Sequence, residues 1–240
     1  MLSQRTQAIK DSLFAQPRRV TMERARLYME SYKETQGEPP VIRRAKAFKH
    51  LLENHKIVLD EHDLLVGNRT DTPRAGVVSP EMSPYWILDE LDKFPSRQQD
   101  RFEISEEDKS YYKEVLYPFW RNRSLNDWYR AHLAENLAEA QKTRIFSVAQ
   151  TDKGQGHIIC DFPLVLQNGF GALLAEAEQK LAQDSENYFY AATVIVLKAT
   201  IAYVQRYEAA VLQAKANAPS ETRAQELGRL AEILHYIATE

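Results

Sequence analysis

The nonapeptide Gly154-Gln155-Gly156-His157-Ile158-Ile159-Cys160-Asp161-Phe162 carries most of the information about the fold of this chain. It follows residues 143–149, whose β-branched and apolar side chains predict a strand. The two glycines let the backbone approach a ligand closely, and His157 brings both a hydrogen-bond donor and an acceptor. Side chains four residues apart in a strand share a face, so a strand from His157 would place Asp161 beside it. Two interpretations stay open: a shared binding pocket, or a hairpin turn tied down by a His–Asp hydrogen bond.

Other chemistries at this segment are excluded by its sequence. It lacks the Lys-Ser/Thr end of a phosphate-binding P-loop and the third glycine of a dinucleotide-binding loop. Cys160 is the single cysteine, so the chain can form neither an internal disulfide nor a cysteine-rich zinc site. On a strand it would face away from His157, and its isoleucine neighbours predict a small buried cysteine rather than a nucleophile. The six histidines show no spacing typical of a metal site.

The charge balance of the chain excludes a dedicated nucleic-acid binder. The 240 residues include 31 Lys and Arg against 34 Asp and Glu, a formal net charge of −3 at pH 7, and phosphate contacts need clustered cations that are missing here. The first residues lack the apolar core of a signal peptide. The longest apolar run, residues 191–202, is interrupted by Lys198 and is shorter than the about 20 residues of a membrane span, so it predicts a buried helix. We therefore expect a cytoplasmic protein without membrane or nucleic-acid partners.

Capping residues and apolar spacing predict a mostly helical chain with short strands, an α/β fold class. Residues 57–59 and 64–66 are expected to be short strands or buried extended segments, and the prolines of residues 68–84 predict an ordered loop. No internal linker can be placed, and the last helix reaches Glu240 without a stop signal. Helices are expected over residues 22–34, 40–52, 85–94, 105–116, 124–141, 163–183, 186–214 and from Ser220 onward.

Four segments, taken in order, resemble the N-terminal part of a glycyl radical enzyme of the pyruvate formate-lyase family. The order and spacing of these segments make the resemblance specific, although each is weak alone, and it spans most of the chain. The first three are similar to the dehydratase-type branch, and the fourth is similar to the family's Gly-x-Gly-Arg-Ile-Ile-x-Asp-Tyr segment. They are Leu64-Leu65-Val66-Gly67-Asn68, the Ser79-Pro80-Glu81 turn with Trp86 and Glu90-Leu91, Tyr117-Pro118-Phe119-Trp120-Arg121-Asn122-Arg123-Ser124, and the nonapeptide from Gly154 to Phe162.

One departure from the family pattern bears on the substrate. Pyruvate formate-lyase proper has an arginine where this chain has His157, and glycerol dehydratase is similar to this chain in having histidine. An arginine fork suits a carboxylate, whereas a neutral histidine can donate to or accept from a hydroxyl. The resemblance therefore implies a dehydratase or C–O lyase acting on a small polyol or related hydroxylated substrate. We expect His157 to hydrogen-bond a substrate hydroxyl and Asp161 to support His157 or the strand.

The resemblance also implies machinery that this sequence does not contain. Family catalysis needs a glycyl radical in a C-terminal loop and a thiyl-forming cysteine, and Cys160 has the wrong context because Phe162 stands where dehydratases have a glutamate. Residues 1–240 are thus expected to be the N-terminal portion of a pyruvate formate-lyase-type domain, an inactive fragment holding the helical part and first strands of an incomplete ten-stranded α/β barrel. No catalytic residue, metal site or bound cofactor is expected in it.

The partners follow from the same resemblance. An iron–sulfur activase that uses S-adenosylmethionine would install the radical in the full-length enzyme, in anaerobic metabolism. The missing C-terminal portion would cover an apolar face that the fragment leaves exposed, and a homodimer stays open.

Three competing interpretations remain. The chain could be a noncatalytic helical scaffold or partner-binding module, it could belong to a formate C-acetyltransferase like pyruvate formate-lyase itself, or it could be a histidine-dependent hydrolase that works alone in air.

Overall fold

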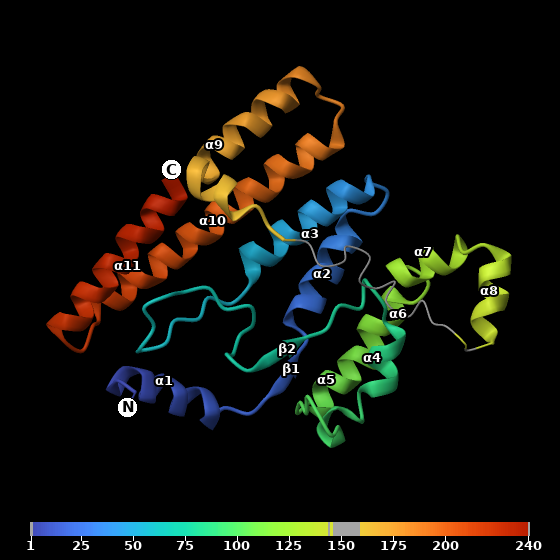
Figure 1. The fold of residues 1–240 in the computed structure, drawn as a ribbon, viewed down its shortest axis with the longest axis horizontal. Helices are drawn as coiled ribbons and strands as arrows, with labels where there is room; N and C mark the ends of the chain where they lie inside the picture. Colours follow the sequence, from blue (N-terminus) through green and yellow to red (C-terminus); the bar gives the residue numbers. More distant parts are fainter. Residues whose placement is uncertain (1, 144, 146–158, 240) are drawn as a thin grey trace. The chain divides into compact units, whose positions relative to one another are not determined.

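The computed structural model describes residues 2–143, 145 and 159–239, and its contacts divide the chain into two compact units (Figure 1). Unit 1 comprises Met1–Pro17, Glu30–Arg74 and Asp161–Glu240, and unit 2 comprises Arg18–Met29 and Ala75–Cys160. Helix α2, Glu23–Glu34, contributes its first half to unit 2 and its second half to unit 1. Each unit is described separately below.

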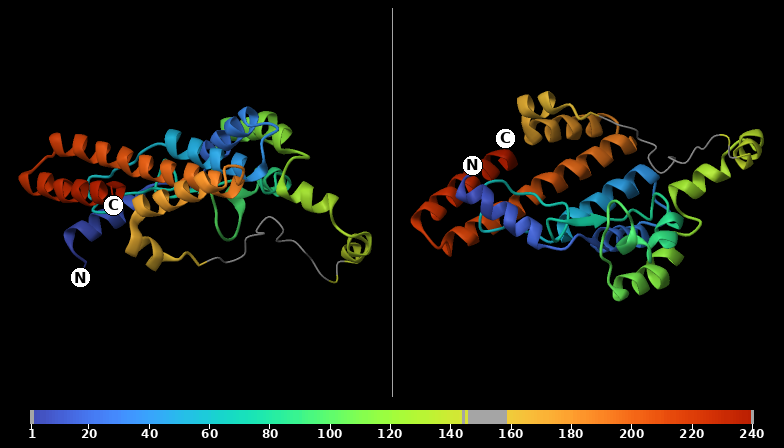
Figure 2. Two further views of the ribbon diagram at one scale, coloured as in Figure 1. Left: turned by 90° about the horizontal axis from the view of Figure 1, so that it is seen from above. Right: turned by 60° about the horizontal axis from the view of Figure 1, so that its bottom comes forward.

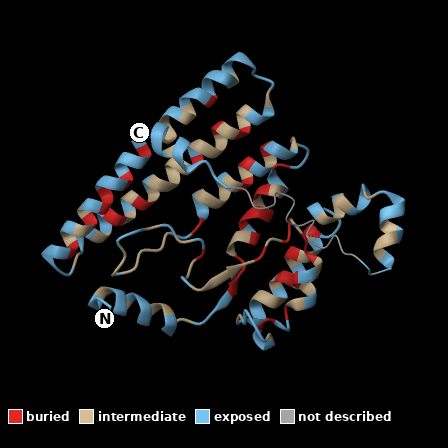
Figure 3. Cartoon of the chain, viewed as in Figure 1, coloured by how far each residue is buried: buried red, intermediate tan, exposed pale blue. Residues whose placement is uncertain are grey.

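Unit 1 is a helical assembly organised around one long helix. Helix α10 contacts α3, α9 and α11, and α9 also contacts α11. Buried residues of α10 and α11 form its larger core cluster, which includes Tyr207, Val211, Leu227, Leu230 and Leu234 (Figure 3). Its helices, besides the end of α2, are α1 (Gln4–Ala15), α3 (Pro40–Asn54), α9 (Phe162–Gln183), α10 (Tyr188–Ala216) and α11 (Glu221–Thr239).

The segment after α3 packs against the α10–α11 core without forming a strand. Ile57, Leu59 and Val66 are partly buried against the cluster that contains Tyr207. Short strands over residues 57–59 and 64–66 are wrong, and the expectation of buried extended segments holds only in part, because Leu64 and Leu65 are 49% and 85% exposed. No neighbouring strand is available among the described residues of unit 1, so the segment is held by side-chain packing instead.

Unit 2 combines a two-stranded parallel sheet with short helices. Strands β1 (Arg19–Thr21) and β2 (Ala75–Val77) pair in parallel with Arg19 opposite Ala75. A core cluster that includes Ile87, Leu91 and Tyr112 fills the unit. Its helical elements are α4 (Tyr85–Glu90), the 3-10 turn η1 (Phe94–Ser96), α5 (Glu106–Tyr111), the π-helical turn η2 (Tyr112–Leu116), α6 (Tyr117–Trp120), α7 (Leu125–Ala131) and α8 (Glu135–Lys142), which Figure 2 shows from two further sides.

Most expected helices are confirmed, and the differences have local causes. The helix expected over 85–94 ends at Glu90 and is followed by η1, which begins at Phe94 with Pro95 in its first turn. The helix expected from Ser124 to Gln141 is two helices, because the chain leaves helical geometry at residues 132–134. Helix α1 and the β1–β2 pair were not expected. The strand expected over 143–149 lies almost wholly outside the described residues.

Helix α10 corrects the expectation drawn from the short apolar run. At 29 residues, it is long and apolar enough to cross a membrane by length and composition. Core helices of soluble proteins meet the same criteria but are mostly buried, whereas 17% of the apolar window of α10 is buried, where α10 contacts α3, α9 and α11. The contacts account for its buried residues, among them Ala192, Val194 and Ala199.

Candidate functional site

The structure describes one of the two expected substrate-binding residues. Asp161 is the N-cap of α9: its Oδ1 accepts a hydrogen bond from the backbone N–H of Leu164 at 3.1 Å. Residues 159–161 are not in a strand, so the expected strand does not extend to Asp161. His157 lies outside the described residues, and the expected pairing of His157 with Asp161 therefore stays a prediction.

The prediction that Cys160 is buried is wrong, because its side chain is exposed. Its apolar neighbour Ile159 is also exposed, and so is Asp161. Apolar neighbours in the sequence predicted burial, but burial requires a packing partner in space.

Helix α9 is two helical sections joined at a glycine. Gly169 has φ 71° and ψ 169°, a conformation essentially restricted to glycine, and it interrupts the helix between Asn168 and Phe170. The first section is fixed at both ends, by the Asp161 cap and by Asn168, whose Nδ2 donates to the carbonyl oxygen of Leu164 at 2.8 Å. The section after Gly169 contributes Ala177 to the buried residues of the unit.

The second family-like segment is anchored by a buried ion pair in unit 2. The Glu81 side chain is only 3% exposed, and its Oε1 accepts from Arg24 Nη2 at 2.6 Å. The guanidinium of Arg24 also lies 4.1 Å from the ring centroid of Tyr28. Burial opposes the charge of Arg24, but the hydrogen bond and charge of Glu81 prevail and raise its pKa above the ordinary value. This pair fixes the turn at Glu81 rather than presenting a reactive group to solvent.

The two residues that directly follow the third family-like segment, Leu125 and Asn126, are hydrogen-bonded to the turn of the second. The backbone N–H of Leu125 donates to the carbonyl oxygen of Glu81 at 2.9 Å, and that of Asn126 donates to the carbonyl oxygen of Met82 at 3.0 Å. Asn126 Nδ2 also donates to Ser83 Oγ at 3.1 Å. These bonds join the start of α7, directly after the third segment, to residues 81–83, about 40 residues earlier in the sequence of unit 2.

A carboxylate at the start of α7 completes this structure. Ser124 and Asp127 form a capping box, and Tyr85 Oη donates to Asp127 Oδ1 at 2.5 Å. Burial and the bond to Asp127 raise the pKa of Tyr85. Burial would raise the pKa of Asp127, yet the hydrogen bonds from Ser124 and Tyr85 lower it below its usual range. Asp127 is therefore held as a carboxylate that accepts hydrogen bonds, a structural role.

The first family-like segment ends at Asn68, whose backbone contacts two tyrosine side chains of α10. The backbone N–H of Asn68 donates to Tyr207 Oη at 3.1 Å, and its carbonyl oxygen lies 3.1 Å from His55 Nε2 and 3.5 Å from Tyr203 Oη. Gly67, just before it, has φ 115°, which only glycine adopts easily. All three described family-like segments therefore carry structural contacts, which spacing in the sequence did not reveal.

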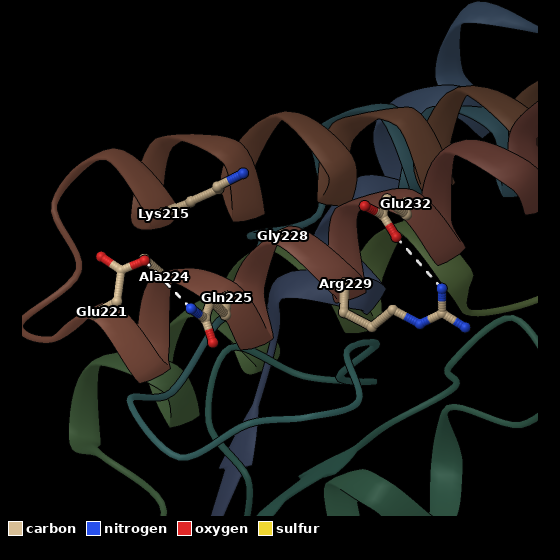
Figure 4. A pocket seen from close by; sticks show the side chains of 7 residues that line it. All are labelled: Lys215, Glu221, Ala224, Gln225, Gly228, Arg229 and Glu232. Carbon is tan, nitrogen blue, oxygen red and sulfur yellow. Dashed lines mark hydrogen bonds and ion pairs between the residues drawn. The ribbon is translucent and has the colours of Figure 1, made fainter.

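A surface depression of about 360 Å³ lies between α10 and α11 (Figure 4). Its lining carries charges of both signs, and Arg229 pairs with Glu232 at 3.3 Å on the same helix. It is open to solvent and lies away from the expected site residues in sequence. Among the described residues, no group of three or more His, Cys, Asp or Glu side chains is placed to hold a metal ion.

The sequence did not predict that Arg24, Tyr85 and Asp127 join distant segments of unit 2 through hydrogen bonds and an ion pair. Arg24 lies 57 residues before Glu81 and Tyr85 lies 42 residues before Asp127, so no local spacing connects them. The Ser124–Asp127 capping box was visible as a pattern three residues apart. From the sequence, Ser124 was expected only to begin a helix.

The comparison with known proteins covers nearly the whole chain. Residues 2–240 match the family model described as pyruvate formate lyase-like. An isethionate sulfite-lyase from Oleidesulfovibrio alaskensis is 29% identical over 247 residues, which cover 95% of this chain and 30% of the relative. The chain therefore spans about a third of the length of the curated relatives it matches.

Solved structures agree with this result. The glycerol-bound B12-independent glycerol dehydratase from Clostridium butyricum matches with a TM-score of 0.92 and 32% identity, over 100% of this chain and 32% of the other. A glycyl radical enzyme from Archaeoglobus fulgidus matches with a TM-score of 0.88 and 30% identity, over 99% of this chain and 31% of the other. The expected fold class, a helical N-terminal part of this fold with few strands, is thereby confirmed. The chain belongs to the pyruvate formate lyase-like family, whose members include the glycyl radical dehydratases.

Proposed function

We propose that residues 1–240 are the N-terminal portion of a cytoplasmic glycyl radical dehydratase or related C–O lyase that acts on a small polyol or similar hydroxylated substrate. The single observation that carries this proposal is the match of the entire chain to a glycerol-bound glycerol dehydratase at a TM-score of 0.92. A radical-generating glycine and a thiyl-forming cysteine in a suitable context are not found in this sequence. The 240-residue chain alone is therefore expected to be inactive.

Two residues of the chain have proposed roles at the substrate. His157 would donate a hydrogen bond to a substrate hydroxyl or accept one from it, because a neutral imidazole can do either. Asp161 would act indirectly, since its Oδ1 already accepts from Leu164 N–H and fixes the start of α9 four residues beyond His157. In this proposal Asp161 is a positioning residue.

The radical chemistry belongs to parts of the enzyme outside this chain. A glycyl radical, installed by an activase with an iron–sulfur cluster and S-adenosylmethionine, would supply hydrogen abstraction in the assembled enzyme. The part played by residues of this chain is to bind and orient the substrate.

The leaving group is the open choice within this proposal. The names of the relatives include a (2S)-3-sulfopropanediol dehydratase and isethionate sulfite-lyases. The alternative within the family is a formate C-acetyltransferase of the pyruvate formate-lyase type. Histidine rather than arginine at position 157 favours a neutral hydroxylated substrate over a carboxylate such as pyruvate.

The test is substrate turnover by the activated full-length enzyme with His157 intact or changed. We expect His157→Ala to lower kcat/KM for a polyol by about 10- to 100-fold, because a hydrogen bond to the reacting group is lost. His157→Gln, which keeps a donor and an acceptor, should retain more activity. Unchanged turnover and affinity in His157→Ala would refute the assignment. A noncatalytic scaffold, the candidate from another class, would show no turnover with any substrate while still binding its partner.

A further inference from the structure

Helix α1 belongs to unit 1, yet none of its residues is buried there. Two of its apolar side chains, Ile9 and Phe14, are 42% and 65% exposed. By contrast, α3, α10 and α11 of the same unit each bury several residues. Burial of apolar side chains is the main source of stability for most helices in a fold, and it contributes little to the attachment of α1 within unit 1.

An ion pair attaches the first turn of α1 to α11. Arg5 Nη2 lies 2.5 Å from Glu226 Oε1, and the two side chains are 33% and 22% exposed. The hydrogen bond from Arg5 lowers the pKa of the Glu226 carboxyl more than burial raises it, so Glu226 is a carboxylate at neutral pH. Glu226 Oε2 also lies 3.2 Å from Nη1 of Arg223, which donates to the carbonyl oxygen of Asp63 at 2.9 Å. Arg5 therefore binds a carboxylate that is already fixed in place.

A second arginine binds the other end of α1. Arg74 Nη1 donates to the carbonyl oxygen of Gln16, the C-cap, at 2.9 Å and to that of Phe14 at 3.3 Å. The last carbonyl groups of a helix have no partner within the helix and carry partial negative charge, so they favour a cation. The guanidinium of Arg74 also lies 5.3 Å from the centroid of the Phe14 ring. Both ends of α1 are thus attached to unit 1 by a guanidinium group.

The helix is too short to be stable without these attachments. It has 12 residues, and isolated helices shorter than about 12–15 residues are marginal in water because the first turn is costly to form. Within α1, Ser3 accepts from the Thr6 N–H at 3.1 Å and Gln7 donates to Asp11 at 2.8 Å. These bonds are local and do not attach the helix to its unit. We therefore expect α1 to lose its helical structure when it detaches.

We propose that α1 is a strap that ionic strength can release: it docks on unit 1 through the Arg5–Glu226 and Arg74 contacts and unfolds when those contacts are screened or removed. Salt screens partly exposed charges but leaves apolar packing intact, so α1 should open while the core of α10 and α11 stays folded. Segments that undergo such order–disorder transitions come from the least stable parts of a fold.

The test is hydrogen exchange of the 240-residue chain, measured by mass spectrometry at constant pH. Sodium chloride is raised from about 0.1 M to about 1 M, over which the Debye length falls from about 10 Å to about 3 Å. Exchange of the α1 amides should become about fivefold faster, the size of effect expected for the loss of a partly exposed ion pair. Exchange of the α10 and α11 amides should not change.

Variants connect the effect to the two arginines. Arg5→Gln keeps a side chain with good helix propensity and should speed exchange of α1 about fivefold at low salt, with a smaller further response to salt. Adding Arg74→Gln should remove most of the remaining response. The matched control is Arg229→Gln, the same change at an ion pair with Glu232 at 3.3 Å on α11. It should leave exchange of α1 as in the wild type.

Three results would overturn the inference. The first is α1 exchange in the wild type that does not change with salt, and the second is equal exchange in the wild type and Arg5→Gln, because other contacts would then hold the helix. The third is faster exchange of α10 and α11 together with α1, which would indicate unfolding of the whole unit. The measurement needs neither a radical nor a substrate, so its outcome is independent of the proposed reaction.

Discussion

Replacement of Asp161 by alanine should loosen the start of α9. The Asp161 carboxylate accepts from the backbone N–H of Leu164, the third residue of the helix, at 3.1 Å, which is the usual geometry of an N-cap. Loss of an N-cap costs about 1 kcal/mol, within a range of roughly 0.5–2 kcal/mol. Because the first section of α9 ends at Gly169, few further turns compensate for the loss. The opening equilibrium of this section should rise about fivefold.

Hydrogen exchange of the Leu164 amide measures this directly. Exchange should be about fivefold faster in Asp161→Ala, whereas Asp161→Asn and Asp161→Ser should remain within roughly twofold of wild type, since both side chains are good caps. Asp184→Ala, the same chemical change at the other end of α9, is the control and should leave Leu164 unaffected.

The Asp161 variants that keep an N-cap also distinguish a positioning role of this residue from direct contact with the substrate. In the assembled enzyme, Asp161→Asn and Asp161→Ser should keep most activity if the residue only positions the chain. Unchanged Leu164 exchange in Asp161→Ala, or a complete loss of activity in Asp161→Ser with normal exchange, would refute the reasoning.

Three further predictions concern the structural contacts. Arg24→Met should destabilise unit 2 by about 3 kcal/mol in urea unfolding, because it removes the ion pair of the buried Glu81 carboxylate with Arg24, and adding Glu81→Gln should recover part of the loss. Tyr207→Phe should cost about 1 kcal/mol in the same assay and speed exchange of the Asn68 amide, because the phenol oxygen is its acceptor; unchanged exchange would contradict this. The pKa of Asp127 is lower in the folded protein than its ordinary value, so the stability that this carboxylate contributes is complete above a pH of about 4 and is lost as the pH falls below that value. The free energy of unfolding of Asp127→Asn should therefore change less with pH over that interval than that of wild type.

Local signals predicted the helices well and the tertiary contacts poorly. Ser105, Ser124 and Ser220 each begin a helix as their side chains suggested, because an N-cap acts over three residues and is visible in the sequence. The β1–β2 pair joins residues 19–21 with residues 75–77, and nothing in either tripeptide indicates the other. Such pairings depend on the path of the intervening chain.

The candidate site was less accessible to sequence reasoning than the fold. The family was predictable because its segments recur in a fixed order, yet those segments prove to hold loops and turns in place, as Glu81 does through Arg24. Cys160 was expected to be buried because the sequence near it is apolar, yet it is exposed, since apolar neighbours in sequence do not by themselves supply packing partners in space. A match in these segments therefore identifies the architecture independently of catalytic competence.

The backbone of Gly169 limits which sequences this helix can tolerate. An uninterrupted helix of 22 residues would run straight for about 33 Å, and glycine at this point is what diverts it. Any side chain with a Cβ would be strained at φ 71° and ψ 169° and would instead favour continuous helical geometry. The mutation Gly169→Ala would thus stabilise continuous helical geometry at this position and change the direction in which residues 162–168 run. A change that strengthens the helix would thereby displace the Asp161 cap, which lies eight residues before the glycine.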